Sequence, residues 1–531
     1  MLNLLLFSCA RVGAPNGGTR DSLAPKFLGS NIDTTRLNVS RTVKELRLDF
    51  DEYVMLKDFN KNFNVSPPIK KIKKVIPSNL ANKYVLIQWE DTLQANTTYN
   101  FNFGNAIVDN NESNPLPYFN FAFSTGDKID DLFVSGTVKD AMTLIKENQT
   151  AKDNKMVVGL YKAGENLDYK QKPDYITKVD EENYFELNFL PKGEFVIIAF
   201  DDENQNSVYD AGKEKVSFLK EKITLDSTSV RGLKLKLYPS KKVVKYKESK
   251  AINGGLLMTF EGNPETVEVK SLSEELKDFK VTHAKRSDSV NIWFDAEKSN
   301  LGGTVSKQLK LSYFTPTISD TISVSYKAVK EEFKLSNEAG NLIAPENNFV
   351  INTSLPIENL NTSSWKLESD SIAQDFTAKI SEKNPFKILV NSSFKPTKKY
   401  VLTIPKETVS SYYSSNDKSF QFQFEIDKPE NYGSFTAVIK NKPTAKFWVE
   451  LTNEKGEILY SQFTNASEVS FKNLKPATYI ARIRVDNNGN GFWDEADFAQ
   501  NIAAEDVYIF EKEINVRPLW EIKEDWELTN H

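Results

Sequence analysis

The sequence predicts an all-β protein built from tandem β-sandwich domains. Apolar and polar residues alternate at 46–50 (LRLDF), 99–103 (YNFNF) and 420–424 (FQFQF). Such alternation describes strands that bury one face and expose the other. Clusters of turn-forming residues separate these segments at short intervals, as in β-sandwiches. No long segment repeats apolar residues at helical spacing, so we expect few helices.

Length and composition fit several domains. A chain of 531 residues corresponds to about three to five domains at ordinary domain size. Its 7 Trp, 20 Tyr and 35 Phe supply material for several packed cores. The 68 basic and 73 acidic side chains leave a net charge of −5. This near-balance argues against a nucleic-acid binder, which shows a basic excess, and against an acidic disordered chain.

Scarce cysteine and histidine exclude several kinds of site. The chain has one Cys and two His, His283 and His531. These cannot form a Cys/His zinc site, an internal disulfide framework or a heme attachment motif. No phosphate-binding Gly-rich loop, nucleophile elbow or HExxH motif occurs. We therefore expect no enzyme, although a hydrolase using only two carboxylates stays open because the chain holds many acids.

The single cysteine suggests a compartment. An apolar run ends at Leu6-Phe7-Ser8-Cys9, which resembles a bacterial lipobox. That resemblance implies acylation of the Cys9 thiol, with 1–19 as signal remnant and tether, and an outer-membrane location. No basic residue precedes Cys9, unlike an ordinary secretory signal, so an incidental cysteine in a buried apolar terminus is the alternative. Surface-exported lipoproteins of the Bacteroidetes resemble one another in an acidic cluster just after the Cys, whereas the first acid here is Asp21. By that resemblance the periplasmic face is favoured over the cell surface.

Residues 20–130 resemble a known family. The segment 93–99 (LQANTTY) is followed by an Asp/Asn loop and closes with 123–126 (FSTG). This pattern is similar to the S-layer-type bacterial Ig-like domains of Bacteroidetes outer-membrane lipoproteins. A divergent copy occurs at 394–404 and 420–426, which suggests a second Ig-like domain over 336–430.

A second type of repeat is clearer. Residues 190–202 align without gaps to 474–486. Both resemble transthyretin-like, carboxypeptidase-regulatory-like β-sandwiches, which we expect over 131–240 and 431–531. Matched positions of the two copies lie 301, 299 and 284 residues apart. An Ig-like plus transthyretin-like module is therefore interpreted as duplicated, with an unassigned β-sandwich at 243–335 between the copies, and the whole is expected to be elongated.

Both transthyretin-like copies carry an Asp/Asn loop after the aligned strand. Oxygen-bearing side chains at loop positions 1, 3, 5 and 9 match the ligand spacing of EF-hand-type calcium loops, whose position 7 supplies a carbonyl and position 12 a carboxylate. The predicted Ca²⁺ ligands are Asp486, Asn488, Asn490, Phe492, Asp494 and Asp497 in the second copy, and Asp202, Asn204, Asn206, Val208, Asp210 and Glu214 in the first. The alternative is that Asp, Asn and Gly merely form turns. At 109–112 (DNNE) we expect a solvated loop rather than a cation site.

These features predict a non-enzymatic, lipid-anchored cell-envelope protein. It would act as a scaffold, an adhesin-like rod or an accessory subunit of an outer-membrane complex, with an outer-membrane barrel as one possible partner and no nucleic acid. Fold resemblance alone does not decide a function. The alternative is a carbohydrate-binding or polysaccharide-processing accessory lipoprotein, for which exposed Trp or Tyr in one groove is the discriminating feature.

Overall fold

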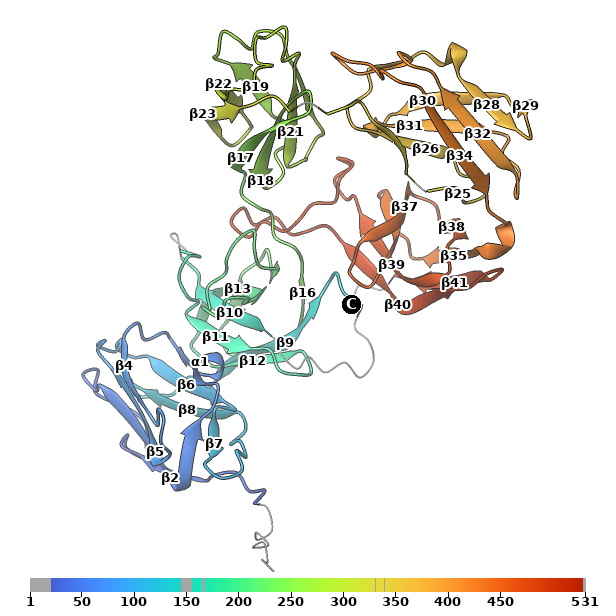
Figure 1. Ribbon diagram of the computed structural model, residues 1–531. Coiled ribbons are helices and arrows are strands. Elements are labelled where there is room, and N and C mark those ends of the chain that lie inside the picture. The colour runs from blue at the N-terminus through green and yellow to red at the C-terminus, as the bar shows by residue number, and fades with distance from the viewer. Residues whose placement is uncertain (1–20, 145–154, 165–167, 330, 339, 529–531) are drawn as a thin grey trace, which may run out of the picture. The chain divides into compact units, whose positions relative to one another are not determined.

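The computed structural model describes residues 21–144, 155–164, 168–329, 331–338 and 340–528 (Figure 1). In these ranges the chain forms 41 strands, one single-turn helix, α1 (Phe59–Asn62), and two short 3-10 helices, η1 (Thr362–Ser364) and η2 (Pro429–Asn431). The all-β prediction is confirmed. None of the helices in these ranges is long and apolar enough to cross a membrane.

The first sandwich packs two sheets around an aromatic core. One sheet has the order β1-β2-β5-β4, with β7 also paired to β2, and the other has the order β3-β6-β8. Tyr99, Phe101 and Phe103 of β6 point inward and are almost fully buried. Its strands are β1 (Phe27–Ser30), β2 (Glu45–Leu56), β3 (Asn64–Ser66), β4 (Ile72–Ile76), β5 (Asn82–Trp89), β6 (Thr98–Gly104), β7 (Ile107–Asp109) and β8 (Phe119–Ser124).

The second sandwich joins a sheet β11-β10-β13-β14, in which β15 also pairs with β13, to a sheet β12-β9-β16. The paired strands β10 and β13 are apolar for most of their length because the core lies against them. Its strands are β9 (Leu132–Asp140), β10 (Met156–Lys162), β11 (Tyr175–Lys178), β12 (Tyr184–Leu190), β13 (Gly193–Asp201), β14 (Val216–Phe218), β15 (Ile223–Leu225) and β16 (Val230–Leu237).

The third sandwich has the sheets β17-β18-β21-β20 and β19-β22-β23. Leu256, Met258 and Ile292 are fully buried in its core. Its strands are β17 (Lys245–Ile252), β18 (Gly255–Glu261), β19 (Glu268–Ser271), β20 (Lys280–His283), β21 (Ser289–Trp293), β22 (Lys307–Phe314) and β23 (Ser319–Tyr326).

The fourth sandwich has the sheets β24-β26-β31-β30 and β25-β34-β32-β28-β29, with a two-stranded pair β27-β33. Phe349 and Phe424 stack face to face in its core, with ring centroids 4.1 Å apart. Its strands are β24 (Leu335–Asn337), β25 (Leu342–Ile343), β26 (Phe349–Thr353), β27 (Asn359–Leu360), β28 (Lys366–Ser369), β29 (Ile372–Ala373), β30 (Phe376–Ser381), β31 (Asn384–Ser392), β32 (Lys399–Ile404), β33 (Val409–Ser410) and β34 (Phe420–Ile426).

The fifth sandwich has the sheets β37-β36-β39-β40 and β38-β35-β41. Within each sheet the strands occur in the same order as in the second sandwich, which is the topology that a duplicated module requires. Its strands are β35 (Gly433–Lys440), β36 (Phe447–Thr452), β37 (Ile458–Thr464), β38 (Glu468–Leu474), β39 (Ala477–Val485), β40 (Val507–Val516) and β41 (Glu521–Glu527).

The first and fourth sandwiches share a specific hydrogen bond. The hydroxyl of Tyr99 accepts the backbone N–H of Gln94 at 2.8 Å, and the hydroxyl of Tyr400 accepts that of Lys395 at the same distance. Each tyrosine also stacks on a phenylalanine of the neighbouring strand, at 5.9 and 5.6 Å between ring centroids. A tyrosine that bonds back to the chain just upstream is a feature of Ig-like sandwiches. The parallel drawn from sequence between the two segments therefore extends to atomic contacts.

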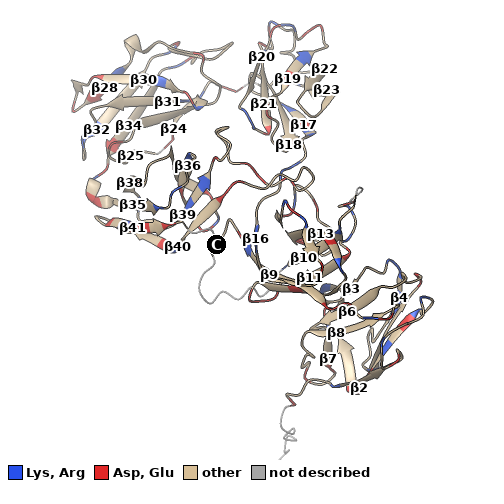
Figure 2. Cartoon of the chain, turned by 180° about the vertical axis from the view of Figure 1, so that it is seen from behind, with Lys and Arg blue, Asp and Glu red and all other residues tan. Residues whose placement is uncertain are grey.

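Contacts divide the chain into two compact units. The first takes in the described residues within Met1–Lys139, Thr150–Asp210 and Val216–Leu237, and the second those within Asp140–Gln149, Ala211–Lys215 and Tyr238–His531. The predicted elongated arrangement stays a prediction. Lys and Arg are interspersed with Asp and Glu over all five sandwiches (Figure 2), as the near-balanced charge leads us to expect.

The hydrogen bonds of Tyr99 and Tyr400 allow a test of whether the first and fourth sandwiches use this tyrosine in the same way. Tyr99→Phe and Tyr400→Phe each leave a backbone N–H without its partner, which costs about 1–2 kcal/mol of local opening free energy. Hydrogen exchange followed by mass spectrometry on the full chain should show faster exchange in β6 and β8 for the first variant and in β32 and β34 for the second. Tyr53→Phe is the control, because Tyr53 is 56% exposed. Exchange equal to that control in both variants would contradict the shared role.

Candidate functional site

Two kinds of feature are candidates for function: the predicted calcium loops and a polar cavity. Cys9, the predicted lipidation site, lies outside the described residues, so its role stays a prediction.

The 486–506 loop joins β39 to β40 and is organised by a buried carboxylate. Asp486 follows the last residue of β39 and is only 3% exposed. Its Oδ1 accepts the backbone N–H of Asn490, and its Oδ2 accepts that of Gly491, both at 3.0 Å. Two charge-assisted hydrogen bonds to backbone donors hold the loop tightly curved around this side chain.

The next side chains of the loop bond to one another. Asn488 Oδ1 accepts the N–H of Asn490 at 3.0 Å, and Asn490 Oδ1 accepts the N–H of Phe492 at 2.8 Å. The amide Nδ2 atoms of Asn488 and Asn490 both donate to Asp494 Oδ2, at 2.5 and 2.7 Å. Four of the predicted ligands are therefore brought together in one loop.

Asp497 lies differently from the prediction. Its Oδ1 accepts the N–H of Gln500, and its backbone pairs with Ile502 in a short bridge, so this carboxylate caps a separate turn. Glu505, which sequence spacing did not single out, reaches into the loop instead. Its Oε1 accepts the N–H of Asn488 at 3.1 Å and its Oε2 that of Asp494 at 2.9 Å. Burial raises the pKa of Glu505 above its usual range, although these hydrogen bonds oppose the rise.

The loop of the second sandwich repeats this pattern. Asp202 Oδ1 and Oδ2 accept the N–H groups of Asn206 and Ser207, each at 3.0 Å. Asn204 Oδ1 accepts the N–H of Asn206, and its Nδ2 donates to Asp210 Oδ2 at 2.6 Å. These bonds match those of the other loop position by position, so the sequence repeat extends to the hydrogen bonds of the loops.

The turn positions of the two loops adopt the same left-handed backbone. Gly489 and Gly491 have φ values of 72° and 83°, and the corresponding Gln205 and Ser207 have φ values of 58° and 62°. Side chains with a Cβ adopt this region at a cost of roughly 1–2 kcal/mol. The first loop therefore keeps the shape of the second without its glycines, and Ser207 at position 6 does not change the backbone.

The remaining predicted ligands are placed as follows. The N–H of Val208 donates to Asn206 Oδ1, and the Phe492 ring lies under Arg286, 4.7 Å from the guanidinium carbon. Glu214 is buried, and its backbone carbonyl accepts the Ser240 hydroxyl at 2.7 Å. It belongs to the second compact unit, whereas Asp202 belongs to the first. Among the described residues, no group of three or more His, Cys, Asp and Glu side chains is placed to hold a metal ion.

The 486–506 loop also joins distant parts of its unit. Arg286, in the turn between β20 and β21, places its Nη1 2.7 Å from Asp494 Oδ1 and its Nε 2.6 Å from Glu265 Oε1. The backbone N–H of Ala496 donates to the carbonyl of Pro239, and the N–H of Lys241 donates to the carbonyl of Ala496. Segments of the chain that are 208 to 257 residues apart are therefore tied together at this loop.

The contact between Arg286 and Asp494 should weaken in acid. Burial raises the pKa of the Asp494 carboxyl, but hydrogen bonds from Asn488, Arg286 and Asn490 outweigh it, so the pKa lies below its ordinary value. A carboxyl with a lowered pKa contributes stability that is present above the unfolded pKa, about 3.9, and is lost as the pH falls through the folded pKa. Hydrogen exchange at 284–287 and 486–494, corrected for its intrinsic pH dependence, should rise between about pH 5 and about pH 3.

Asp494→Asn is the matched control for this titration. The amide keeps the size of the side chain but has no charge to lose, so the acid step at 284–287 should become smaller and exchange there should be faster already at neutral pH. The part of the step that remains belongs to Glu265, which also pairs with Arg286 and has a pKa below its ordinary value. An acid step that persists unchanged in Asp494→Asn would show that another group controls this contact.

Asp109 organises a third loop. It is only 2% exposed, and its Oδ1 accepts the N–H groups of Asn111 and Glu112 at 2.8 and 2.6 Å, while its Oδ2 accepts that of Asn114 at 2.9 Å. Burial raises its pKa, but these backbone donors bring the pKa below its usual value. The expectation of a solvated loop fails at this residue, because the carboxylate is a buried internal cap.

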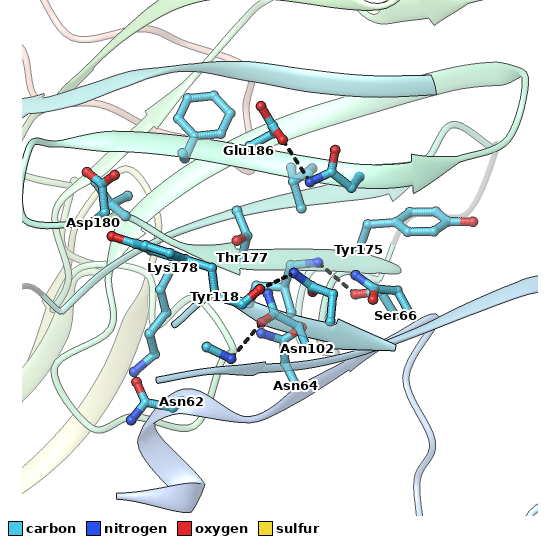
Figure 3. Close-up of a pocket in the computed structure, with 18 of the residues that line it drawn as sticks. Asn62, Asn64, Ser66, Asn102, Tyr118, Tyr175, Thr177, Lys178, Asp180 and Glu186 are labelled. Atoms are coloured by element: carbon cyan, nitrogen blue, oxygen red, sulfur yellow. Dashed lines mark hydrogen bonds between the residues drawn. The ribbon is translucent and has the colours of Figure 1, made fainter. Parts of the chain in front are cut away.

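A polar cavity of about 650 Å³ lies within the first unit (Figure 3). One wall is the outer face of the sheet β3-β6-β8, and the other is formed by β11, β12 and the turn between them. The N–H of Ile176 donates to the Ser66 hydroxyl at 3.2 Å and links the two walls at one end. Seven asparagines line it: Asn62, Asn64, Asn100, Asn102, Asn105, Asn120 and Asn188.

Charged and aromatic side chains complete the lining. Lys61, Lys178, Asp180, Glu181 and Glu186 contribute both signs of charge. Burial, and to a smaller extent Lys61, lowers the pKa of Lys178. Three tyrosines, Tyr118, Tyr175 and Tyr184, also line the cavity, together with the apolar residues Ile176, Phe185 and Leu187.

The cavity was not predicted from the sequence, although a signal for it exists. In the segment 99–103 the asparagines occupy the polar positions of an alternating strand, and the alternation was interpreted only for its buried face. Asn is depleted in strands because its side chain competes for backbone hydrogen bonds. Repeated Asn on the exposed face of a strand is therefore unusual enough to single out a functional surface.

Comparison with known families supports the Ig-like fold of the first sandwich. Residues 21–125 match the family model of the bacterial Ig-like domain, which confirms the prediction for this segment. None of the curated proteins with which the chain was compared matches it.

Among solved structures, the chain is similar at 12% identity to the S-layer protein rSbsC(31-844), covering 93% of this chain and 67% of that one, with a TM-score of 0.15. It is similar at 11% identity to BcpA, the major pilin subunit of Bacillus cereus, covering 75% of this chain and 99% of that one, with a TM-score of 0.14. The Bacillus anthracis TIE protein is 11% identical, with 97% and 76% coverage and a TM-score of 0.13. Scores this low carry no argument about function.

Proposed function

We propose that the protein is a non-enzymatic, lipid-anchored scaffold of the cell envelope. The observation that carries the proposal is the use of the 486–506 loop: Asp494 pairs with Arg286, and Ala496 pairs with the linker residues Pro239 and Lys241. Long loops of β-sandwiches usually carry binding or catalytic residues. Here the loop connects sandwiches to one another, which is what a scaffold requires.

The membrane part of the proposal rests on Cys9. Acylation of its thiol would attach the chain to the outer membrane, with the periplasmic face favoured, and leave the sandwiches free to engage an outer-membrane barrel or another envelope protein. Each buried methylene of an acyl chain contributes about 0.8 kcal/mol, so more than one chain is needed for stable anchoring.

We further propose that Ca²⁺ rigidifies the two Asp/Asn loops. In the 486–506 loop the oxygens of Asp486, Asn488 and Asn490 each accept one hydrogen bond. An oxygen of this type has two lone pairs, so each retains one for a cation. Glu505 would supply the last carboxylate in place of Asp497. Bound Ca²⁺ would neutralise the clustered acids and fix the loop against its neighbours.

Calcium should raise the melting temperature of the full chain. A ligand present at a hundred times its dissociation constant stabilises the folded state by about 2.7 kcal/mol. Differential scanning calorimetry in excess Ca²⁺ and then in excess EDTA should show an upward shift with calcium that EDTA reverses. Because the sandwiches need not unfold together, the shift is expected in the transition that includes the fifth sandwich.

Two variants assign the effect to particular residues. Glu505→Gln removes a carboxylate that contacts the loop and should abolish the calcium shift of that transition, whereas Asp497→Asn should leave it unchanged because Asp497 caps a separate turn. If the unmodified chain melts at the same temperature in calcium and in EDTA, the calcium proposal is contradicted.

The anchor is tested by fractionation. The full chain expressed in a diderm bacterium should co-sediment with outer membranes and bring down the same envelope protein in repeated cross-linked pull-downs. Cys9→Ala should move the chain to the soluble fraction, because the thiol is the only acylation site predicted. A Cys9→Ala chain that stays in the outer-membrane fraction would remove the anchor from the proposal.

A further inference from the structure

A row of asparagines crosses the sheet β3-β6-β8 on the face that lines the cavity. Asn64 of β3 lies opposite Asn102 of β6 in the register of the sheet, and Asn102 lies opposite Asn120 of β8. Neighbouring strands are about 4.8 Å apart, so three amides form a regular polar row. Asn100 and Ser66, paired in the next row, extend this surface.

The row is costly for the fold. Within the described chain, the Oδ1 atoms of Asn64 and Asn100 are buried without a hydrogen-bond partner, and Asn100 is only 8% exposed. A buried acceptor left unsatisfied costs about 1–3 kcal/mol. Natural structures keep few such groups, and those that remain call for an explanation. The amides of Asn64 and Asn100 therefore have hydrogen-bonding capacity that the protein itself does not use.

Tyr118 adds a second unfavourable feature to the same wall. Its φ is 52°, a left-handed conformation that is rare for a bulky residue, and its side chain is 68% exposed. Two asparagines hold it there, since Asn105 Oδ1 accepts its N–H at 3.1 Å and Asn120 Nδ2 donates to its carbonyl at 2.9 Å. An aromatic ring is thus fixed at the cavity in a strained backbone, as side chains at binding sites often are.

The opposite wall presents a polar strand face. Tyr184, Glu186 and Asn188 alternate along β12 and all line the cavity. Glu186 accepts the Tyr184 hydroxyl at 2.6 Å and the Asn188 amide at 2.9 Å, so the three side chains are fixed relative to one another. The two walls together offer a preformed surface of amides, a carboxylate and tyrosines.

We propose that this cavity is a binding site for a neutral saccharide. Amide groups donate and accept hydrogen bonds at once, which matches hydroxyl groups that do the same. Exposed tyrosine rings offer flat apolar faces for the C–H face of a sugar ring, with a polar hydroxyl at one end. The volume of about 650 Å³ falls in the range of small-molecule sites and accommodates a short oligosaccharide.

Other ligand classes fit less well. Two lysines and three acids line the cavity, so a strongly anionic ligand would meet more negative than positive charge. An apolar lipid would bury the asparagine amides without hydrogen bonds, at the cost given above. A neutral polyhydroxylated ligand meets neither difficulty. The inference goes beyond the scaffold proposal and does not depend on it.

The test uses the full chain and defined glycans. A glycan microarray followed by saturation-transfer NMR with maltotriose, cellotriose, mannotriose and chitotriose should reveal binding to at least one neutral glycan. Asn102→Asp keeps an acceptor for the N–H of Gly104 but replaces the amide donor by a charge, and Tyr118→Ala removes the exposed ring. Each should weaken binding about tenfold or more, the effect of losing one good contact.

Matched controls separate binding from folding. Tyr53→Ala and Asn111→Ala change residues of the same types in the same sandwich that do not line the cavity, and they should leave glycan binding unchanged. All four variants should keep the circular dichroism spectrum of the unmodified chain. Tyr118→Ala should not lower the melting temperature, because removing this exposed ring breaks no buried contact.

The outcomes are decisive for the saccharide site alone. Absence of binding to any glycan on the array, or binding that survives both cavity variants, would overturn the inference. Binding that the controls weaken as much as the cavity variants would place the sugar elsewhere and overturn it too. A chain that binds no glycan but still brings down an envelope protein would leave the scaffold proposal intact.

Discussion

The two-residue period of the β-strand is the constraint on which the rest of this structure depends. Each strand has one set of side chains that must pack into a core and another that is free of that demand. In β6, Tyr99, Phe101 and Phe103 fill the core, while Asn100 and Asn102 face the cavity. The aromatic positions stabilise the sandwich well enough for the alternate positions to carry amides that are poor strand formers. Stability and binding chemistry therefore share one strand without competing for the same side chains.

Buried carboxylates determine the shape of the loops through hydrogen bonds to the backbone. Asp109, Asp202 and Asp486 are each almost fully buried, and each accepts at least two backbone N–H groups of the loop that follows it. A charge in the interior is tolerated only when hydrogen bonds replace its hydration. In Asp202 and Asp486 each carboxylate oxygen accepts one of these bonds and keeps a lone pair, so one residue both closes a turn and offers a ligand. Turn formation and cation binding, which the sequence presented as alternatives, are therefore compatible in these loops.

The sequence predicted the features that depend on neighbouring residues, but not those that depend on contacts between distant segments. Alternation and turn clusters predicted the all-β fold. The ungapped match of 190–202 to 474–486 predicted two equivalent loops, and in the structure these loops share their hydrogen bonds. The ligand spacing assigned Asp497 to the loop, because that assignment only counts residues. In the structure Glu505 enters the loop, because the pairing of β39 with β40 brings the end of the loop back to its start. The cavity was equally out of reach. It depends on the register that aligns Asn64, Asn102 and Asn120 across three strands and on the approach of β12, which are long-range properties of the folded chain.

The internal repeat separates the features that both modules share from those that only the first module has. At the spacing of 301 residues, Tyr99 corresponds to Tyr400, Phe101 to Leu402 and Phe103 to Ile404, so the buried positions stay apolar or aromatic in both Ig-like sandwiches. The cross-strand pair of Asn102 and Asn120 is replaced by Thr403 and Gln421, which occupy the same register in the fourth sandwich. In the second and fifth sandwiches, Glu186 and Asn188 correspond to Ser470 and Lys472. Both walls of the cavity have thus changed together in the second module while the cores and the loop hydrogen bonds have not. The amide and carboxylate chemistry of the two cavity walls is therefore present in the first module and absent from the matching positions of the second.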